Sequence, residues 1–167
     1  KLHRQAITLE KMGHQFDEQV LFNEANLILE AGSKLAIIGD NGVGKTSLLK
    51  CLLGDLKPTQ GKYQWAENAT IAYCPQDSSD EFHGDLNLFD WMSQWRRPHH
   101  DDQIVRATLG RLLFSSDDFL KQASVCSGGE KNRLLFGKIM MSDANVLIMD
   151  EPTNHLDMES IEALNLA

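Results

Sequence analysis

Apolar and polar residues alternate along the start of the chain, which is the pattern of half-buried β-strands. Residues 6–10 alternate most clearly, and residues 20–22 and 25–29 are apolar enough for two more short strands. Residues 12–18 and 30–33 have the polar and glycine-containing composition of turns. The pattern therefore predicts a β-rich, antiparallel region at the start of the chain.

Two continuous apolar runs predict strands of a different kind. Residues 35–38 read LAII, and residues 146–149 read VLIM. The second run is typical of a strand buried on both faces of a parallel sheet. Residues 61–65 and 70–74 also resemble strands. We therefore expect a parallel core beside the antiparallel region.

Helical spacing of apolar residues dominates the middle of the chain. A helix from Lys45 is expected to end near Gly54, a suitable residue for the position after a helix. Residues 86–95 and 104–113 predict two further helices, and Ser127 is a good N-cap for a third. Residues from about 80 to 140 are thus predicted to form a helical insertion.

A glycine-rich stretch lies between the first continuous run and the first helix. Residues 39–46 read GDNGVGKT, which fits the phosphate-binding pattern G-x-x-x-x-G-K-[ST]. Gly42 and Gly44 allow the backbone to curl so that its N–H groups surround an anion, and the helix adds its positive end. Lys45 can reach the β- and γ-phosphates, and the Thr46 hydroxyl can ligate Mg²⁺. The predicted nucleotide-binding residues of this loop are Gly39, Asp40, Asn41, Gly42, Val43, Gly44, Lys45, Thr46 and Ser47.

Two acidic residues follow the second continuous run. Asp150 comes directly after the predicted strand, at the edge where open α/β sheets bind ligands. There it can bind Mg²⁺ directly or through water. Glu151 is the candidate base that polarises an attacking water. The alternative is two acidic residues that only cap the following turn.

Composition limits the classes of protein to which the chain can belong. The 167 residues suffice for one domain, and 42% are hydrophobic and 24% charged, as in ordinary folded proteins. No apolar run is long enough to cross a bilayer, so any role at a membrane requires another chain. The net charge of −8 argues against a self-sufficient nucleic-acid binder. The three cysteines form no C-x-x-C pair, which favours free thiols.

A second predicted anion site precedes the third helix. Ser127, Gly128, Gly129 and Glu130 place a serine and two glycines at a helix start, which suits a second phosphate. Together with the glycine-rich loop, Asp150 and the Gln76 that follows a predicted strand, this order of motifs resembles the ATP-binding cassette (ABC) ATPases. The resemblance spans residues 39–157.

The resemblance implies an α/β fold of the P-loop NTPase class. It consists of an N-terminal antiparallel β subdomain, a RecA-like parallel core and a helical insertion. The implied boundaries are a β-rich start (1–34), a nucleotide-binding core (35–79 and 142–167) and a helical subdomain with the signature (80–141). All of these belong to one ABC domain.

The subfamily resemblance lies in two segments. Residues 151–157 read EPTNHLD and residues 127–131 read SGGEK, which is similar to the ABC-F proteins. Within that subfamily, the segments Phe114-Ser115, Phe136-Gly137-Lys138 and Met140-Met141 resemble the second cassette of the bacterial YbiT-type members. ABC-F proteins are soluble and cytoplasmic, carry two cassettes in one chain, and act on the ribosome near the exit-site tRNA. The resemblance implies contacts with ribosome and tRNA through regions outside this chain, without membrane insertion.

The resemblance also implies residue roles. Phe16 stacks on adenine, although a core or surface phenylalanine is the alternative. Gln76 contacts Mg²⁺ and the attacking water and acts in catalysis with Lys45 and Glu151, while Thr46, Gln76 and Asp150 form the metal site. Residues 127–130 bind the γ-phosphate of ATP held by a second cassette, either in the same full-length chain or in a homodimer. The implied cofactors are ATP and Mg²⁺, and the implied reaction is ATP hydrolysis.

The chain departs from the family pattern in three places. Thr46-Ser47 is an ordinary swap of Ser-Thr, and either hydroxyl can bind the metal. Cys126 stands where leucine is usual, and we interpret it as a small apolar substitute. The switch histidine of the family follows the loop at 154–157, beyond Ala167, and His155 is not that residue. We therefore expect a piece of a longer protein, incomplete at its C-terminus, that alone binds nucleotide weakly and hydrolyses it poorly.

Other functions remain open. The chain can be the ATP-binding motor subunit of an ABC membrane transporter, although the Asn-His-Leu-Asp sequence at 154–157 favours ABC-F. It can also be a slow ATPase that serves as an ATP-gated clamp. A P-loop GTPase or kinase is disfavoured, because no Asn-Lys-x-Asp motif is present.

Overall fold

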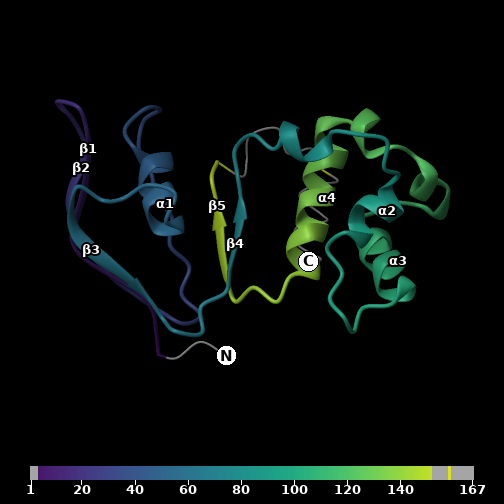
Figure 1. Cartoon of the computed structure of the whole chain (residues 1–167), viewed down its shortest axis with the longest axis horizontal. Helices are drawn as coiled ribbons and strands as arrows, with labels where there is room; N and C mark the ends of the chain where they lie inside the picture. The colour runs from purple at the N-terminus through teal and green to yellow at the C-terminus, as the bar shows by residue number, and fades with distance from the viewer. Residues whose placement is uncertain (1–3, 152–157, 159–167) are drawn as a thin grey trace. The chain divides into compact units, whose positions relative to one another are not determined.

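The computed structural model describes residues 4–151 and 158, which divide between two compact units. The sheet unit contains residues 4–71 and 145–150. The helical unit contains residues 72–144, 151 and 158. Figure 1 labels the elements of both, and each unit is described by itself.

Three antiparallel strands form the sheet of the sheet unit. They are β1 (Gln5–Phe16), β2 (Gln19–Glu30) and β3 (Gln60–Trp65), in the order β2-β1-β3. In the register, Ile7 of β1 lies opposite Leu29 of β2 on one side and Trp65 of β3 on the other. The predicted antiparallel, β-rich start is confirmed.

The sequence predicted three short strands within residues 6–29, and this number is wrong. The structure has two strands in this region, β1 and β2, and each is twelve residues long. Lys11 and Glu24 have left-handed φ angles of 46° and 49°, and the β1–β2 register shifts between Leu9 and Met12. The Lys11 N–H donates to the Asn26 Oδ1 instead of to a backbone carbonyl. These irregularities are β-bulges, which interrupt the apolar alternation without ending a strand.

Helix α1 (Lys45–Leu53) shares a hydrophobic core with this sheet. Cys51 and Leu52 of the helix are buried with Ile7, Leu9 and Met12 of β1. The indole N–H of Trp65 donates to the Leu52 carbonyl at 2.8 Å. The helix ends where predicted, because Gly54 takes a left-handed φ of 87° and its N–H closes the last turn on the Cys51 carbonyl.

The strand predicted at residues 35–38 is not formed, and this prediction is wrong. Residues 33–40 have no regular secondary structure, and the Ile38 side chain is 93% exposed. A continuous apolar run becomes a buried strand only where strands hydrogen-bond to its edges and layers cover its faces. Among the described residues, no strand pairs with this segment.

Strand β5 (Val146–Met149) has the predicted bounds. Its start is fixed by Asn145, whose side chain accepts from the Thr70 N–H and donates to the Asn68 carbonyl, both at 2.8 Å. The predicted burial on both faces is wrong, because Leu147 is 48% exposed while Ile148 is 8% exposed. One face of β5 is thus covered within the described residues and the other is open.

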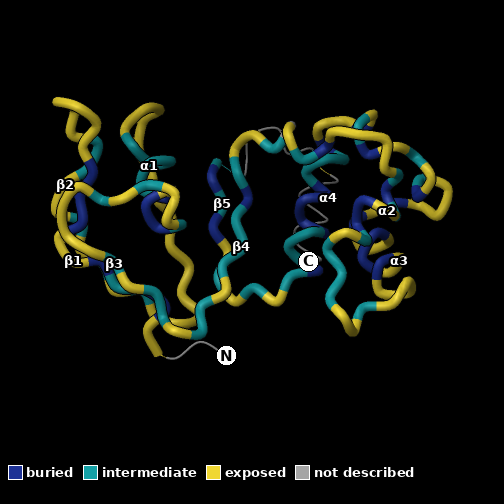
Figure 2. Tube along the Cα trace, in the orientation of Figure 1, coloured by how far each residue is buried: buried dark blue, intermediate teal, exposed yellow. Residues whose placement is uncertain are grey.

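The helical unit confirms the predicted helical insertion. β4 (Ile71–Cys74) leads into it. Its helices are α2 (Leu88–Ser93), α3 (Asp102–Arg111) and α4 (Gly128–Met141), with 3₁₀ turns at Ser79–Phe82, Ser116–Leu120 and Ala123–Val125. The three helices contact one another, and their buried positions appear dark blue in Figure 2. The fully buried side chains of this core include Leu88, Met92, Val105, Leu109, Leu112, Leu134 and Met141.

The predictions for the paired tryptophans and for the cysteines are also confirmed. Trp91 is buried, and its ring lies 5.8 Å from that of Trp95, as expected for two residues that pack in the helical insertion. The three cysteines Cys51, Cys74 and Cys126 are free and buried. In the described part of the chain, no helix combines the length and the apolar character that a membrane crossing requires.

Two glycines of the helical unit provide a matched pair for a stability test. A β-carbon at Gly137 of α4 would lie 2.3 Å from Met92 Cε and 2.6 Å from Leu112 Cδ1, whereas one at Gly110 of α3 would meet no atom within 4 Å. We expect Gly137→Val to lower the free energy of unfolding by about 1–3 kcal/mol through overpacking. Gly110→Ala should instead raise it by about 0.5–1 kcal/mol. Urea unfolding followed by tryptophan fluorescence measures both, and equal effects of the two variants would contradict this packing.

Candidate functional site

The glycine-rich loop of the sheet unit has the backbone curl that its sequence predicts. Gly42 and Gly44 have left-handed φ angles of 80° and 104°, which L-residues with side chains rarely adopt. The Val43 N–H donates to the Asp40 carbonyl at 3.3 Å and closes a turn. A β-carbon at Gly44 would also lie 3.1 Å from the Leu21 carbonyl oxygen. Glycine is therefore required at Gly44 by both conformation and space.

The N-terminus of α1 differs from those of the other helices. Its N-cap is Gly44, no side chain caps it, and its first turn contains no acidic residue. By contrast, Asn87, Asp101 and Ser127 each accept a hydrogen bond from the first turn of α2, α3 and α4. The first-turn N–H groups of a helix and its dipole attract an anion when no side chain satisfies them. The start of α1 is thus suited to a ligand anion.

The Lys45 ammonium group folds back over the loop. Its Nζ donates to the Gly39 carbonyl at 2.6 Å and to the Asp40 carbonyl at 3.0 Å. Both of these acceptors are neutral carbonyl oxygens. A phosphate at the loop would offer Lys45 a charged acceptor, which makes a stronger hydrogen bond.

A hydrogen bond joins the loop helix to the end of β5. The Thr46 hydroxyl donates to Asp150 Oδ2 at 2.7 Å, across 104 residues of sequence. Asp150 is only 4% exposed, and the two residues lie in the same unit. The sequence motifs separately predicted Thr46 and Asp150 as ligands of one metal, and the fold brings the two residues together.

This pair of oxygens fits Mg²⁺. A hydroxyl and a carboxylate are hard oxygen donors, which Mg²⁺ prefers, and two adjacent ligands of an octahedral Mg²⁺ lie about 3 Å from each other. The 2.7 Å separation of Thr46 Oγ1 and Asp150 Oδ2 is close to that value. The third predicted ligand, Gln76, is exposed in the segment after β4 and belongs to the helical unit.

Two other predicted site residues have unusual positions. Phe16 is the last residue of β1, and its side chain is 67% exposed, so the ring is accessible to a ligand. Glu151 is half-buried and has a left-handed φ of 50°, which costs a residue with a side chain about 1–2 kcal/mol. The predicted loop at 154–157, including His155 and Asp157, lies outside the described residues.

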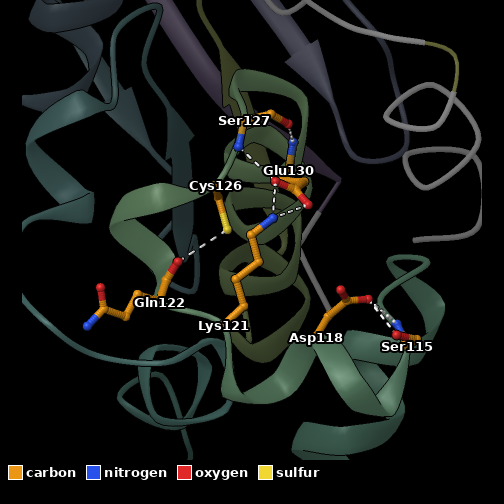
Figure 3. A network of polar contacts seen from close by, with 7 residues as sticks. All are labelled: Ser115, Asp118, Lys121, Gln122, Cys126, Ser127 and Glu130. Carbon is orange, nitrogen blue, oxygen red and sulfur yellow. Dashed lines mark hydrogen bonds and ion pairs between the residues drawn. The ribbon is translucent and has the colours of Figure 1, made fainter.

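The predicted signature forms the start of α4. Ser127 is the N-cap, as predicted, and its Oγ accepts from the Glu130 N–H at 3.2 Å. In return, Glu130 Oε2 accepts from the Ser127 N–H at 2.7 Å, which completes a capping box. Ser127 and Gly128 are exposed, whereas Gly129 is buried. Figure 3 shows Ser127 and Glu130 facing each other at the helix start.

Lys121 joins this network, and the sequence analysis missed it. Its Nζ donates to Glu130 Oε1 at 2.7 Å and to Oε2 at 2.8 Å (Figure 3). The bond to Glu130 raises the pKa of Lys121 above its ordinary value. Burial alone would raise the pKa of Glu130, but the hydrogen bonds from Lys121 and Ser127 outweigh it and leave that pKa below its ordinary value. The nine-residue spacing matches no helical or strand period, so no sequence signal marked this pair.

Cys126 behaves as the apolar substitute that the sequence predicts. Its thiol donates to the Gln122 carbonyl at 3.6 Å (Figure 3). Burial, followed by the negative charge of Glu130, raises the pKa of Cys126. A raised pKa disfavours the reactive thiolate, so this residue fills space beside the signature.

The acidic and histidine-rich segment at residues 99–102 has local structural roles. Asp101 caps α3 through the Ile104 N–H, and Asp102 pairs with Arg96 at 2.6 Å. Within residues 4–151 and 158, no group of three or more His, Cys, Asp or Glu side chains is placed to hold a metal ion.

Comparisons with known proteins agree with this geometry. The sequence pattern of the ABC transporter family matches residues 22–154. The chain is 59% identical over its whole length to Probable ATP-binding protein YbiT of Escherichia coli O157:H7, of which it covers 32%. It is 39% identical to ABC transporter F family member 2 of Arabidopsis thaliana, over 98% of the chain and 24% of that protein. The chain thus spans between about a quarter and a third of these relatives.

The fold is also that of solved ABC proteins. A bacterial Atm1-family ABC exporter with ATP bound superimposes with a TM-score of 0.80, at 18% identity, over 99% of this chain and 33% of the exporter. The predicted α/β fold of the P-loop NTPase class is confirmed.

The Lys121–Glu130 pair predicts a pH-dependent contribution to stability. Glu130 has a lowered folded pKa, so its contribution is present above its unfolded pKa, about 4.3, and is lost as pH falls through the folded value. Lys121 has a raised folded pKa, so its contribution is present below about pH 10.4 and is lost as pH rises through the folded value. We expect Lys121→Met to lower the melting temperature at pH 7 more than at pH 3.

Thermal unfolding of both proteins at each pH measures this difference. The Asp118 pKa is also lowered, chiefly by hydrogen bonds from Ser115 and to a smaller extent by the charge of Lys121. The Ser115 contribution is common to both proteins, and the Lys121 contribution changes stability in the same direction as the Glu130 pair. A Lys121→Met deficit that is as large at pH 3 as at pH 7 would contradict the ion pair.

Proposed function

The chain belongs to the ABC transporter family, and from this membership we propose that it binds ATP with Mg²⁺ and contributes to ATP hydrolysis in the protein of which it is a part. The glycine-rich loop at 39–47 holds the phosphates, and Phe16 stacks on the adenine. Exposed aromatic rings suit this role, because stacking on a base contributes about 1–3 kcal/mol. The uncapped N-terminus of α1 supports the phosphate assignment.

One observation carries the proposal: the 2.7 Å hydrogen bond from Thr46 to buried Asp150. A Gly-Lys-Thr sequence or a strand-end aspartate can each occur by chance. Their meeting in space, with the Lys45 ammonium over the same loop, supports the proposal of a phosphate site and a metal site side by side.

The residues of this site take separate roles in the proposed reaction. Bound Mg²⁺ neutralises charge on the β- and γ-phosphates. Lys45 exchanges its bonds to the Gly39 and Asp40 carbonyls for bonds to phosphate oxygens. Glu151 accepts the proton of the attacking water as a general base, and Gln76 orients that water.

Complete sites are proposed to need a second cassette. The signature Ser127, Gly128, Gly129 and Glu130 would lie at the γ-phosphate of ATP held by that cassette, with the Glu130 carboxylate capping the helix start that receives it. This chain's own ATP would face the partner's equivalent segment. The partner is a second cassette in the same full-length chain or a second copy in a homodimer. ATP then joins the two cassettes, and hydrolysis releases them.

We further propose that the full-length protein is a cytoplasmic ABC-F protein that acts on the ribosome. The support is the similarity to YbiT and to a plant ABC transporter F family member. The motor subunit of an ABC membrane transporter is the second candidate, since the family match and the exporter fold are shared with transporters.

Two acid-to-amide substitutions test the assignment of the ATP site. In the full-length protein, Glu151→Gln should leave MgATP affinity within about threefold of the unmodified value and lower kcat by about 10²–10⁴, because it removes the general base. Asp150→Asn should instead weaken MgATP binding by about tenfold or more, because it removes a charged metal ligand. Fluorescent-nucleotide titration and phosphate release measure the two effects.

Asp143→Asn serves as the control, since Asp143 is an exposed carboxylate in the segment between α4 and β5. It should retain both MgATP affinity and turnover. Turnover that is unaffected by Glu151→Gln would remove Glu151 from the mechanism.

Co-sedimentation separates the two candidate functions. A Glu151→Gln variant that closes on ATP without hydrolysing it should remain bound to ribosomes, because release requires hydrolysis in the proposed cycle. We expect about tenfold or greater enrichment in the ribosome pellet with ATP compared with ADP. Slow hydrolysis without ribosome binding would favour the transporter subunit.

A further inference from the structure

The start of α4 presents an electrostatic conflict if it receives a phosphate. A helix N-terminus attracts anions, but Glu130 in the first turn of α4 carries a negative charge. Its lowered pKa keeps the carboxylate ionised at neutral pH. An uncompensated carboxylate next to a triphosphate would repel it.

Lys121 resolves this conflict through direct contact. Its ammonium lies 2.7 and 2.8 Å from the two oxygens of Glu130 (Figure 3). The nearest other cation in sequence, Lys131, has its Nζ 5.6 Å from the centroid of the Phe82 ring. Among the described contacts of the Glu130 side chain, Lys121 is the cation that neutralises it.

The backbone holds Lys121 in place independently of Glu130. The Lys121 carbonyl accepts from the Leu88 N–H at 2.9 Å, and the Lys121 N–H donates to the Asp118 carbonyl at 2.9 Å. The Ala123 N–H donates to the Leu86 carbonyl, also at 2.9 Å. The segment is therefore attached to the start of α2, and the lysine reaches α4 from a fixed base.

The same network leaves the start of α4 open at Gly128. The Ser127 N–H donates to Glu130, and Ser127 Oγ accepts from the Glu130 N–H. The Ser127 hydroxyl can still donate its own hydrogen to an acceptor. A β-carbon at Gly128 would meet no described atom within 4 Å, and its φ is not left-handed. Packing and conformation therefore do not require glycine at 128, and the space in front of it admits a group from outside the chain.

We propose that Lys121 is a positioning residue that neutralises Glu130 and so makes the start of α4 compatible with the terminal phosphate of ATP on a second cassette. The proposal rests on the proposed function of the signature. Lys121 does not contact the phosphate. It holds the Glu130 carboxylate in the position where that carboxylate accepts from the Ser127 N–H. The Ser127 hydroxyl and the open face at Gly128 then meet the anion.

The test uses the full-length protein with Glu151→Gln, so that trapped ATP is not hydrolysed. The readout is the dissociation rate of labelled ATP after a chase with excess unlabelled ATP. Lys121→Met should accelerate dissociation from one of the two sites by about tenfold, because closure of the cassettes against uncompensated Glu130 is weakened. Lys121→Arg keeps the charge and should stay within about threefold of the parent.

A double variant distinguishes charge compensation from simple helix capping. Lys121→Met with Glu130→Gln removes both charges, and the introduced amide oxygen can still accept from the Ser127 N–H. Dissociation should therefore be several-fold slower than from Lys121→Met alone. If the double variant releases ATP as fast as Lys121→Met alone, or if Lys121→Met traps ATP as well as the parent, the proposal is wrong.

Two further measurements separate the possible failures. Melting temperatures without nucleotide identify a variant that releases ATP only because it unfolds, and the Lys121→Arg and double variants then decide the question. If the parent binds no ATP at all, the proposed function fails and this inference fails with it. If the parent binds and traps ATP and Lys121→Met does too, only the inference fails.

Discussion

The hydrogen bond between Thr46 and Asp150 is the constraint on which the candidate site depends. It joins the first turn of α1 to the end of β5, across 104 residues of sequence, and two other features of the sheet unit fix these two elements. The hydrophobic core with Cys51 and Leu52 fixes α1 on the three-stranded sheet. The Asn145 side chain fixes the start of β5. A displacement of either element by one hydrogen-bond length would separate the two oxygens that are proposed to bind the metal.

Features set by local chemistry could be predicted from the sequence. Gly54 ends α1 and Ser127 begins α4 because a left-handed glycine and a capping hydroxyl act within one helical turn. The phosphate loop is equally local. By contrast, the bulges at Lys11 and Glu24 and the missing strand at 35–38 depend on pairing between distant segments, and an apolar run does not encode its partners.

The site residues also divide into those that local motifs predict and those whose positions depend on distant contacts. Motif spacing predicted Thr46 and Asp150, and the fold brought them together. Lys121 escaped prediction because its contact with Glu130 crosses a 3₁₀ turn and a loop, so no periodic spacing links the two. Its position depends on backbone bonds to α2, which no pattern in residues 115–131 reveals.

In the proposed function, two helix starts of this chain receive anions by different means. α1 has a glycine N-cap and no first-turn acid, so its N–H groups and Lys45 face the ligand directly. α4 satisfies part of its N-terminus with its own carboxylate, and Lys121 cancels that charge. A chain with a net charge of −8 gains no general attraction for a polyanion. The proposed anion binding must therefore come from such local arrangements. The capped, charge-neutral N-terminus of α4 suits a phosphate that arrives on a partner and has to leave again. The uncapped N-terminus of α1 suits a phosphate that is held.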